Sequence, residues 1–262
     1  MTVKLETRGL TIAFGGIVAV EDLNLALHEG GFLGLIGPNG AGKTTVFNLL
    51  TGVYKPTRGE ILFKGAPIHN LQPHQVVRLG IARTFQNIRL FSTLSVLENV
   101  MVGLAVRVQE SIWQAVALTP GVRRRRGEWV RAAEELLDYV GLRDLAEEPA
   151  TALPYGKQRL IEIARALATG CDVLLLDEPS AGMNQSEKRE LMTLIRDIHD
   201  QLNKTILIIE HDMKVVMNLV ERVVVLDYGR QIAEGPPEEI QKNPLVIEAY
   251  LGGIDETVME AV

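Results

Sequence analysis

The stretch Gly37-Pro-Asn-Gly-Ala-Gly-Lys43-Thr44 constrains this chain more than any other feature of its sequence. It fits the pattern G-x-x-x-x-G-K-[ST], and it lies between an apolar run at 31–36 and an apolar-periodic segment at 43–50. That context predicts a buried strand, a glycine-rich loop and a helix in succession. Glycines let backbone N–H groups turn inward around an anion, and a helix N-terminus adds positive potential. The sequence therefore predicts a binding site for phosphate groups.

The side chains of this loop have separate expected tasks. We expect Lys43 to reach the β- and γ-phosphates of a nucleotide, Thr44 to join the ligand shell of Mg²⁺, and Thr45 to contact the α-phosphate. The residues expected to hold the nucleotide here are Gly37, Pro38, Asn39, Gly40, Ala41, Gly42, Lys43, Thr44 and Thr45.

Two adjacent carboxylates, Asp177 and Glu178, follow the apolar run at 173–176. A buried parallel strand can hold a carboxylate rigidly at its C-terminal end, where α/β proteins bind ligands. We expect Asp177 to orient Mg²⁺ through water and Glu178 to polarise the attacking water as a general base. The alternative is an acidic strand end that caps the next helix.

Two other polar residues follow apolar segments. The segment T-I-L-I-I-E-H-D brings His211 to a strand end from which it can reach the γ-phosphate. The segment A-R-T-F-Q ends a predicted strand with Gln86, whose side chain can bind Mg²⁺ or water and whose backbone can report occupancy of the site. We interpret the remaining histidines as ordinary surface or core residues.

Short apolar runs alternate with longer helical patterns along the chain, which is typical of an α/β protein. From 95 to 169 the strand signal disappears, so we expect a helical lobe inserted into the sheet domain, and 237–251 is predicted to form short helices. Strands are predicted at 5–14, 20–27, 31–36, 60–64, 81–86, 172–178, 205–210, 222–227 and 230–234.

Composition limits the kinds of partner. A formal net charge of −6 argues against a nucleic-acid binder, because such proteins displace counterions with a basic face. The apolar runs are far shorter than the ~20 residues that span a bilayer, and the N-terminus lacks the apolar core of a secretory signal. The single cysteine, Cys171, is expected to fill the core. We therefore expect a cytoplasmic chain that does not cross a membrane by itself.

These motifs, in this order, resemble the ATP-binding cassette (ABC) ATPases over essentially the whole chain. The resemblance implies an α/β fold with a P-loop NTPase (RecA-like) core, and ATP and Mg²⁺ as cofactors. It implies one ABC ATPase domain, with a nucleotide-binding core and antiparallel β subdomain at 1–94 and 170–236, an inserted α-helical signature subdomain at 95–169, and a C-terminal helical extension at 237–262.

The same resemblance implies roles for individual residues. It implies that Phe14 stacks on adenine, that Gln86 couples the site to the helical lobe, and that His211 is the switch histidine. Residues 180–184 are implied to face a second subunit. The alternative for Phe14 is an aromatic of the core at the end of a strand.

The segment L-P-Y-G-K-Q-R, residues 153–159, occupies the place of the family's L-S-G-G-Q signature, which closes over the ATP of the other subunit. Pro154 replaces the serine, and Asn184 stands where an aspartate is usual. One interpretation is a signature that works through backbone amides and the dipole of a helix starting at Lys157. The other is a degenerate signature that supports only one productive ATP site. The residues implied to contact the partner's ATP are Tyr155, Gly156, Lys157 and Gln158.

Finer features resemble the longer ATPase subunit of branched-chain amino-acid importers. These are G-I-A-R-T-F-Q-N-I-R-L-F, the long helical lobe and the ending N-P-L-V-I-E-A-Y-L-G-G. The arginine run at 123–126 is expected in a solvated loop or in contact with lipid headgroups or a partner.

That resemblance implies a set of partners and a location. The partners are a second, shorter ATPase, two transmembrane permeases and a periplasmic or extracellular solute-binding protein. The chain would lie on the cytoplasmic face of the inner membrane as a peripheral subunit and would not bind the solute. The alternatives are importers of urea or polar amino acids, the lipopolysaccharide-extracting ATPase, a soluble ABC ATPase, and a P-loop kinase.

Overall fold

The computed structural model describes residues 2–106, 120–210 and 213–251. The strands are β1 Val3–Phe14, β2 Ile17–Leu23, β3 Ala26–His28, β4 Phe32–Ile36, β5 Arg58–Phe63, β6 Ala66–Pro67, β7 Ile81–Arg83, β8 Val173–Asp177, β9 Thr205–Ile209, β10 Arg222–Asp227 and β11 Arg230–Gly235. The helices are α1 Lys43–Leu50, α2 Pro73–Leu79, α3 Val96–Ala105, α5 Pro120–Tyr139, α6 Tyr155–Ala168, α7 Gln185–Leu202, α8 Met213–Leu219, α9 Pro237–Ile240 and α10 Pro244–Leu251, with 3₁₀ turns at Arg143–Leu145 and Ala150–Ala152.

A six-stranded sheet of order β11-β10-β4-β9-β8-β7 forms the centre of the molecule, and its strands from β10 to β7 are parallel. Strand β8 shows why its sequence is a continuous apolar run. Val173 and Leu175 belong to one hydrophobic core, and Leu174 and Leu176 to the core on the opposite face. A strand buried on both faces has no solvent side to fill with polar residues.

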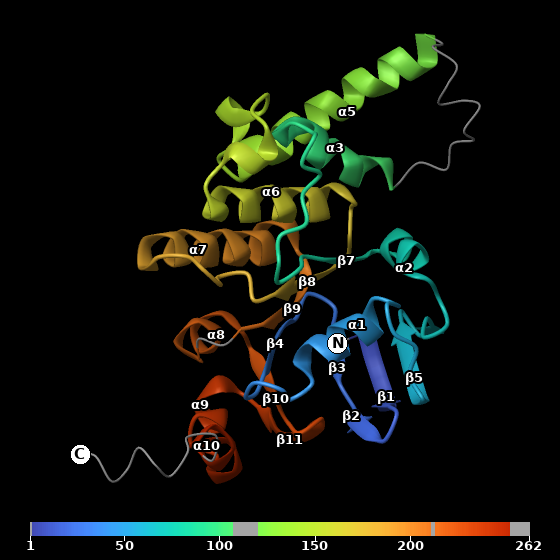
Figure 1. Ribbon diagram of the computed structural model, residues 1–262, viewed down its shortest axis with the longest axis vertical. Coiled ribbons are helices and arrows are strands. Elements are labelled where there is room, and N and C mark those ends of the chain that lie inside the picture. The colour runs from blue at the N-terminus through green and yellow to red at the C-terminus, as the bar shows by residue number, and fades with distance from the viewer. Residues whose placement is uncertain (1, 107–119, 211–212, 252–262) are drawn as a thin grey trace.

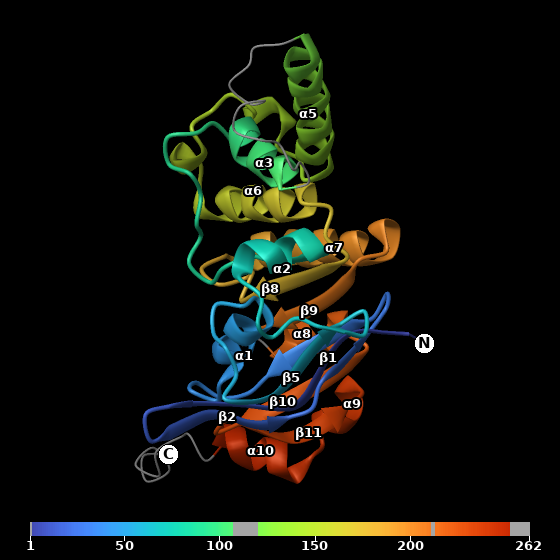
Figure 2. The same cartoon turned by 90° about the vertical axis from the view of Figure 1, so that its right-hand side faces the viewer.

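A second, antiparallel sheet has the order β2-β1-β5-β6, with β3 also paired to β1. Its apolar residues share a core with α1 and with one face of the central sheet. Figure 2 shows this sheet beside the central strands. The expected α/β fold with a P-loop core and an antiparallel β part is confirmed.

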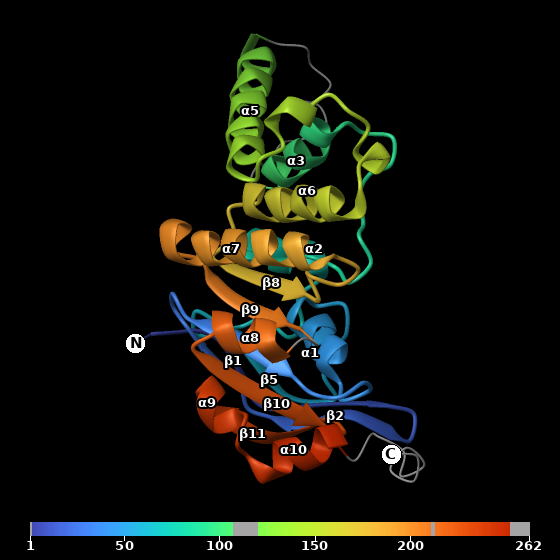
Figure 3. The same cartoon turned by 90° about the vertical axis from the view of Figure 1, so that its left-hand side faces the viewer.

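Helices α3, α5 and α6 form a lobe with its own hydrophobic core, which includes Val100, Leu137 and Ile161. The lobe lies at one end of the molecule, and α9 and α10 lie at the other (Figure 1). Helix α7 lies between α6 and the central sheet, as Figure 3 also shows. Ser95 starts α3 with a capping box, in which its hydroxyl accepts from the N–H of Glu98 and the Glu98 carboxylate accepts from the N–H of Ser95. Because α6 belongs to this lobe, motion of the lobe would move α6 relative to the central sheet.

The sequence predictions for several elements were wrong in detail. The strand predicted at 20–27 is two strands, β2 and β3, which are separated by residues 24–25, and Asp22 near the end of β2 adopts a left-handed φ of 50°. Helix α2 was not predicted, although Pro73 at its first turn and the capping box of Gln72 and Gln75 favour a helix start. The arginine run at 123–126 is helical, within α5, rather than in a loop.

Two expectations from the composition concern membrane-spanning helices and the burial of Cys171. No helix in residues 2–106, 120–210 or 213–251 is long and apolar enough to span a bilayer. Cys171 is a buried free cysteine in the core around α7, as predicted.

Candidate functional site: the phosphate-binding loop and its neighbours

The loop between β4 and α1 requires glycine at particular positions. Gly37, Gly40 and Gly42 have φ of 150°, 80° and 100°. A Cβ on Gly37 would lie 2.1 Å from the Leu226 carbonyl oxygen, and one on Gly42 would lie 2.6 Å from the Ala19 carbonyl oxygen. A side chain at either position would therefore clash with backbone, so these glycines serve close packing as well as the left-handed turn.

Lys43 begins α1 and points back into the loop. Its Nζ donates to the carbonyl oxygens of Gly37 and Pro38, at 2.7 and 2.8 Å, and the residue is 5 % exposed. Burial lowers the pKa of the Lys43 ammonium, while the nearby carboxylates of Glu178 and Asp177 oppose that shift. The predicted cation is therefore held in place by the loop and lies close to both predicted carboxylates.

A cavity of about 300 Å³ opens above the loop. Its lining combines most of the loop predicted to hold phosphates with two residues far away in sequence, Gln86 and Glu178. The lining residues are Ala19, Asn39, Gly40, Ala41, Gly42, Lys43, Thr44, Thr45, Gln86 and Glu178. Both hydroxyl residues at the start of α1 thus share one cavity with the predicted general base.

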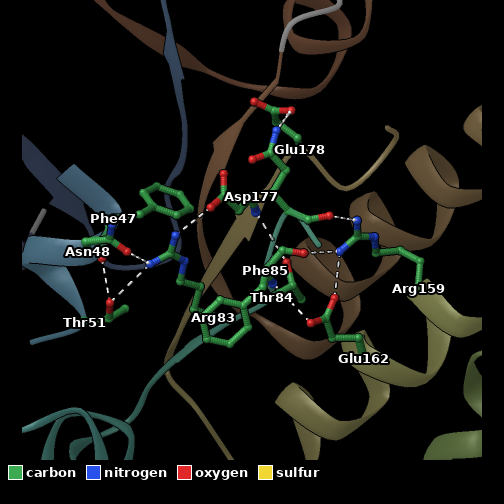
Figure 4. A network of polar contacts seen from close by, with 11 residues as sticks. Phe47, Asn48, Thr51, Arg83, Thr84, Phe85, Arg159, Glu162, Asp177 and Glu178 are labelled. Atoms are coloured by element: carbon green, nitrogen blue, oxygen red, sulfur yellow. Dashed lines mark hydrogen bonds and ion pairs between the residues drawn. The ribbon is translucent and has the colours of Figure 1, made fainter. Parts of the chain in front are cut away.

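Asp177 ends β8 as predicted, and its two oxygens have different surroundings. Oδ2 accepts from the Arg83 guanidinium at 2.7 Å, while Oδ1 is buried without a hydrogen-bond partner (Figure 4). Burial raises the pKa of Asp177, and Arg83 opposes the shift. A buried, unpartnered carboxylate oxygen is costly unless a ligand satisfies it, so Oδ1 fits an outer ligand of a hydrated Mg²⁺.

The described residues contain no group of three or more His, Cys, Asp or Glu side chains that could enclose a metal ion. Mg²⁺ at this site would therefore take its remaining ligands from phosphate oxygens and water, which is its usual preference. Thr44 lines the cavity above the phosphate-binding loop, and its hydroxyl could serve as one further ligand there.

Arg83 is a functional residue that the sequence reasoning missed. Its guanidinium lies between the rings of Phe47 and Phe85, with 5.3 and 5.2 Å to the ring centroids, and also donates to Asn48 at 2.7 Å. Figure 4 shows this side chain reaching from the end of β7 to Asp177. It fixes the carboxylate through Oδ2 and leaves Oδ1 without a hydrogen-bond partner.

Glu178 follows β8 in a left-handed conformation, with φ of 47°, and is 7 % exposed. Its Oε2 accepts from Gln86 Nε2 at 2.8 Å. Gln86 does not end a strand, which corrects the sequence prediction. Strand β7 stops at Arg83, because the backbone groups of Phe85 and Gln86 bond to side chains of α6 instead of a strand. The structure thus brings together the two residues predicted as base and as coupling glutamine.

The signature helix α6 begins at Tyr155, with Pro154 as its N-cap, and not at Lys157 as predicted. The Tyr155 hydroxyl accepts from Arg159 at 3.1 Å, and a Cβ on Gly182 would lie 3.4 Å from the Tyr155 ring. The Tyr155 ring, at the position of a family glycine, therefore lies next to Gly182 in the 180–184 loop. Gln158 turns backward, and its Nε2 donates to the Leu153 carbonyl oxygen at 2.8 Å.

Gly156 and Lys157 line a second cavity, of about 660 Å³, which is bordered by α6, α7 and the residues at the C-terminal end of α5. A Cβ on Gly156 would lie 3.1 Å from Glu187 Oε1 on α7. This cavity shares no lining residue with the cavity above the phosphate-binding loop. Within one chain, the signature residues and the phosphate-binding loop therefore line different cavities.

Asn184 caps α7. Its side chain accepts from the N–H groups of Ser186 and Glu187, at 2.9 and 3.0 Å, and the Glu187 carboxylate accepts from the N–H of Asn184. Asparagine and aspartate are equally good helix caps, so the local structure tolerates the departure from the family's aspartate.

Phe14, at the end of β1, is 46 % exposed, which argues against its being a core aromatic. It packs edge-on against Tyr54, with 5.2 Å between ring centroids.

His211 lies outside the described residues, so its predicted position beside the γ-phosphate stays a prediction. At the C-terminal end, Tyr250 lies next to the Gly37 backbone, and burial raises the pKa of its phenol to about 12.

Two family models match this sequence, each over a different segment. A family model described as "ABC transporter" matches residues 20–181, which hold the phosphate-binding loop, the signature and both carboxylates. The chain belongs to the ABC transporter family. A second model, described as "Branched-chain amino acid ATP-binding cassette transporter", matches residues 230–256 of this ABC transporter chain.

Similar proteins match over nearly the full length. The high-affinity branched-chain amino acid transport ATP-binding protein LivG of Escherichia coli (strain K12) is 45 % identical over 248 residues, which cover 95 % of this chain and 97 % of LivG. The corresponding protein BraF of Pseudomonas aeruginosa has the same identity and coverage. Among solved structures, the ADP conformation of an ATP-binding cassette of an ABC transporter aligns with a TM-score of 0.83 and 30 % identity, covering 96 % of this chain and 100 % of that one.

Proposed function

We propose that this chain is the ATP-hydrolysing subunit of a membrane ABC importer for branched-chain amino acids. As a member of the ABC transporter family it is an ATPase coupled to transport. The observation that supports the substrate is the 45 % identity, along 95 % of this chain, to transport proteins named for branched-chain amino acids. The match of the C-terminal segment 230–256 to a family of the same name supports it independently.

The phosphate-binding loop binds the nucleotide. The inward-facing amides of the loop and the N-terminus of α1 surround the phosphates, and Thr45 contacts the α-phosphate. Lys43 exchanges its bonds to the Gly37 and Pro38 carbonyl oxygens for the β- and γ-phosphate oxygens. Because the ammonium is already held in the loop, little side-chain freedom is lost on binding. Phe14, exposed beside Tyr54, provides a ring on which adenine stacks.

Glu178 acts as the general base of hydrolysis. A water oxygen attacks the γ-phosphorus, its proton passes to the Glu178 carboxylate, and the bond from that phosphorus to the ADP oxygen breaks. Gln86 Nε2 donates to Glu178 Oε2 at 2.8 Å, and a turn of the glutamine toward the phosphates would remove this hydrogen bond and let Oε2 accept the proton of the attacking water instead. The position of Gln86 thereby determines whether Glu178 Oε2 accepts from the glutamine or from the attacking water.

Thr44 and Asp177 would hold the Mg²⁺ of an Mg-ATP substrate, the aspartate through Oδ1 and water. When bound, Mg²⁺ neutralises charge on the β- and γ-phosphate oxygens. Arg83 keeps the Asp177 carboxylate oriented and charged from the opposite side.

A second cassette completes the active site. In this chain the signature residues Gly156 and Lys157 line a cavity separate from that of the phosphate-binding loop. The first-turn amides of α6, starting at Tyr155, instead approach the ATP of the partner cassette, with the positive end of the helix dipole adding to them. Substitutions at Pro154 and Asn184 favour a different, shorter partner ATPase with a more usual signature.

The remaining partners are two transmembrane permeases and a periplasmic or extracellular solute-binding protein. The cassette lies on the cytoplasmic face of the membrane as a peripheral subunit. Closing of the two-cassette sandwich on ATP pulls the permease halves together, and hydrolysis reopens it. The solute passes through the permeases without contacting this chain.

Reconstituted vesicles test the proposal. Vesicles that contain the permeases, both ATPases, internal ATP and the external binding protein should take up radiolabelled leucine, isoleucine or valine. The same vesicles with Glu178→Gln in this chain should take up none. Uptake of urea alone would overturn the substrate, and uptake unaffected by Glu178→Gln would overturn the role of this chain as the energising ATPase.

A further inference from the structure

Arg159, on the first turns of α6, is a fully buried arginine, with 0 % of its surface exposed. Its guanidinium donates to the carbonyl oxygens of Phe85 and Gln86, the latter at 2.8 Å, and to the Tyr155 hydroxyl at 3.1 Å. It also pairs with the Glu162 carboxylate at 2.7 Å. Figure 4 shows it facing the backbone that follows β7. One side chain therefore contacts the signature helix and the glutamine loop at once.

Glu162 completes the contact. It is 1 % exposed, and its Oε1 accepts from the Phe85 N–H at 3.2 Å. Burial raises the pKa of Glu162, and Arg159 and the Phe85 N–H oppose the shift. A buried ion pair is costly unless further hydrogen bonds satisfy it, and here the backbone of the loop supplies them. Arg159 and Glu162 thus supply the hydrogen-bond partners that a neighbouring strand would otherwise give to the backbone of Phe85 and Gln86.

The other end of Gln86 reaches the base. Its Nε2 donates to Glu178 Oε2 at 2.8 Å while its carbonyl oxygen accepts from Arg159. A continuous path of hydrogen bonds therefore runs from Glu178 through Gln86 and Arg159 to Tyr155. It joins the predicted general base of this chain to the helix that contacts the partner's ATP.

We propose that Arg159 is a positioning residue that fixes the Gln86 loop to the signature helix, so that movement of α6 determines whether Gln86 occupies Glu178. This inference rests on the proposed function. The guanidinium is suited to the task because its planar fork makes several hydrogen bonds in fixed directions, which a lysine ammonium cannot reproduce. Arg159 touches no reacting atom and acts through Gln86.

The test uses Arg159→Lys in the assembled transporter, with Arg165→Lys as the matched control. Arg165 is also largely buried on α6 and lies 3.8 Å from the same Glu162, but its guanidinium stacks on Phe91. We expect Arg159→Lys to lower the kcat of ATP hydrolysis about tenfold, the order expected for loss of a charge-assisted hydrogen bond, with the KM for ATP within about twofold of wild type. Arg165→Lys should leave kcat within about twofold.

A double-mutant cycle separates positioning from general structural support. If Arg159 acts through Gln86, Arg159→Lys should add less than about twofold to the defect of Gln86→Ala. Tyr155→Phe, which removes only the hydroxyl, supplies a milder change should Arg159→Lys fold poorly, and should lower kcat by about threefold, again only when Gln86 is present. Circular dichroism and ATP binding of each isolated chain check the fold.

Three outcomes would overturn the inference: an unchanged kcat in Arg159→Lys, equal losses in Arg159→Lys and Arg165→Lys, or additive effects with Gln86→Ala. Failure of the proposed function looks different, because the wild-type assembly would then show no ATP hydrolysis or transport against which the variants could be compared.

Discussion

The phosphate-binding loop and the signature are both built at the start of a helix, yet they are held in different ways. In the loop, Lys43 bonds to carbonyl oxygens only 5 and 6 residues away, within one strand–loop–helix unit. At the signature, Arg159 bonds to carbonyl oxygens 73 and 74 residues away. A site closed within one local segment can bind its ligand alone, whereas a site held by distant segments can respond to movement between them.

The largest effect is expected from Gly156→Asp, which places a charge on the signature. A carboxylate on the first turn of α6 neutralises the positive potential of the helix N-terminus and would repel the γ-phosphate of the partner's ATP, so ATP hydrolysis in the assembled transporter should be lost. The new side chain also meets Glu187 Oε1, which a Cβ would approach to 3.1 Å. Adding Glu187→Gln removes that second repulsion, and we expect no recovery of steady-state ATPase activity. Normal hydrolysis in Gly156→Asp would instead support a degenerate signature.

Glu178→Gln tests the residue at which the hydrogen bonds from the signature helix reach the phosphate-binding site. The amide keeps the shape of the side chain but cannot accept the proton of the attacking water, so kcat should fall by about 10²-fold or more while ATP stays bound. Glu60→Gln, at an exposed position of β5, is the control for loss of a carboxylate. Equilibrium ATP binding and single-turnover hydrolysis measure the two effects separately, and normal turnover would assign the base to another residue.

Lys43→Ala removes the cation of the local site. Loss of charge-assisted contacts to the β- and γ-phosphates should raise the Kd for ATP roughly tenfold or more in the isolated chain. Lys64→Ala removes an exposed lysine that pairs with Asp172 instead, and should leave Kd unchanged. Calorimetry distinguishes the outcomes, and equal affinities in wild type and Lys43→Ala would contradict the assignment of the phosphate-binding loop.

The smallest change is expected from Pro154→Ser, which restores the serine of the family signature. Pro154 already caps α6 with an extended backbone, at φ −54° and ψ 152°, which serine also adopts. ATPase activity in the assembled transporter should stay within about twofold of wild type. A large gain would mean that the hydroxyl missing from this chain limits its signature.

The sequence located the residues of the local site in the fold but did not reveal the contacts that hold the distant one, for a physical reason. Spacing alone specifies the phosphate-binding loop, and the apolar run before Asp177 specifies a strand end, so both could be located without a structure. The end of β7 could not be located from the sequence, because the backbone that follows Arg83 forms hydrogen bonds with side chains of α6. Nor does any local pattern indicate that the Tyr155 ring covers Gly182.

One signal for the missed residues was present in the sequence. Arg159 and Glu162 lie on the same helix face as Ile163, Ala166 and Leu167, at helical spacings of three and four. Charged residues within an apolar stripe are rarely buried unless they are paired, so that pattern predicts an ion pair with a further task. It does not identify the partner backbone, which only the fold brings to α6.

The phosphate-binding loop and the signature line separate cavities, so we expect the loop to serve this chain's own ATP and the signature to serve the partner's. The most direct test is the Kd for ATP of the isolated Gly156→Asp chain, measured by calorimetry beside wild type and Lys43→Ala. Gly156 does not line the cavity above the loop, so we expect a Kd within about twofold of wild type, although the same variant loses hydrolysis in the assembly. Loss of ATP binding in isolated Gly156→Asp, comparable to that in Lys43→Ala, would contradict the account.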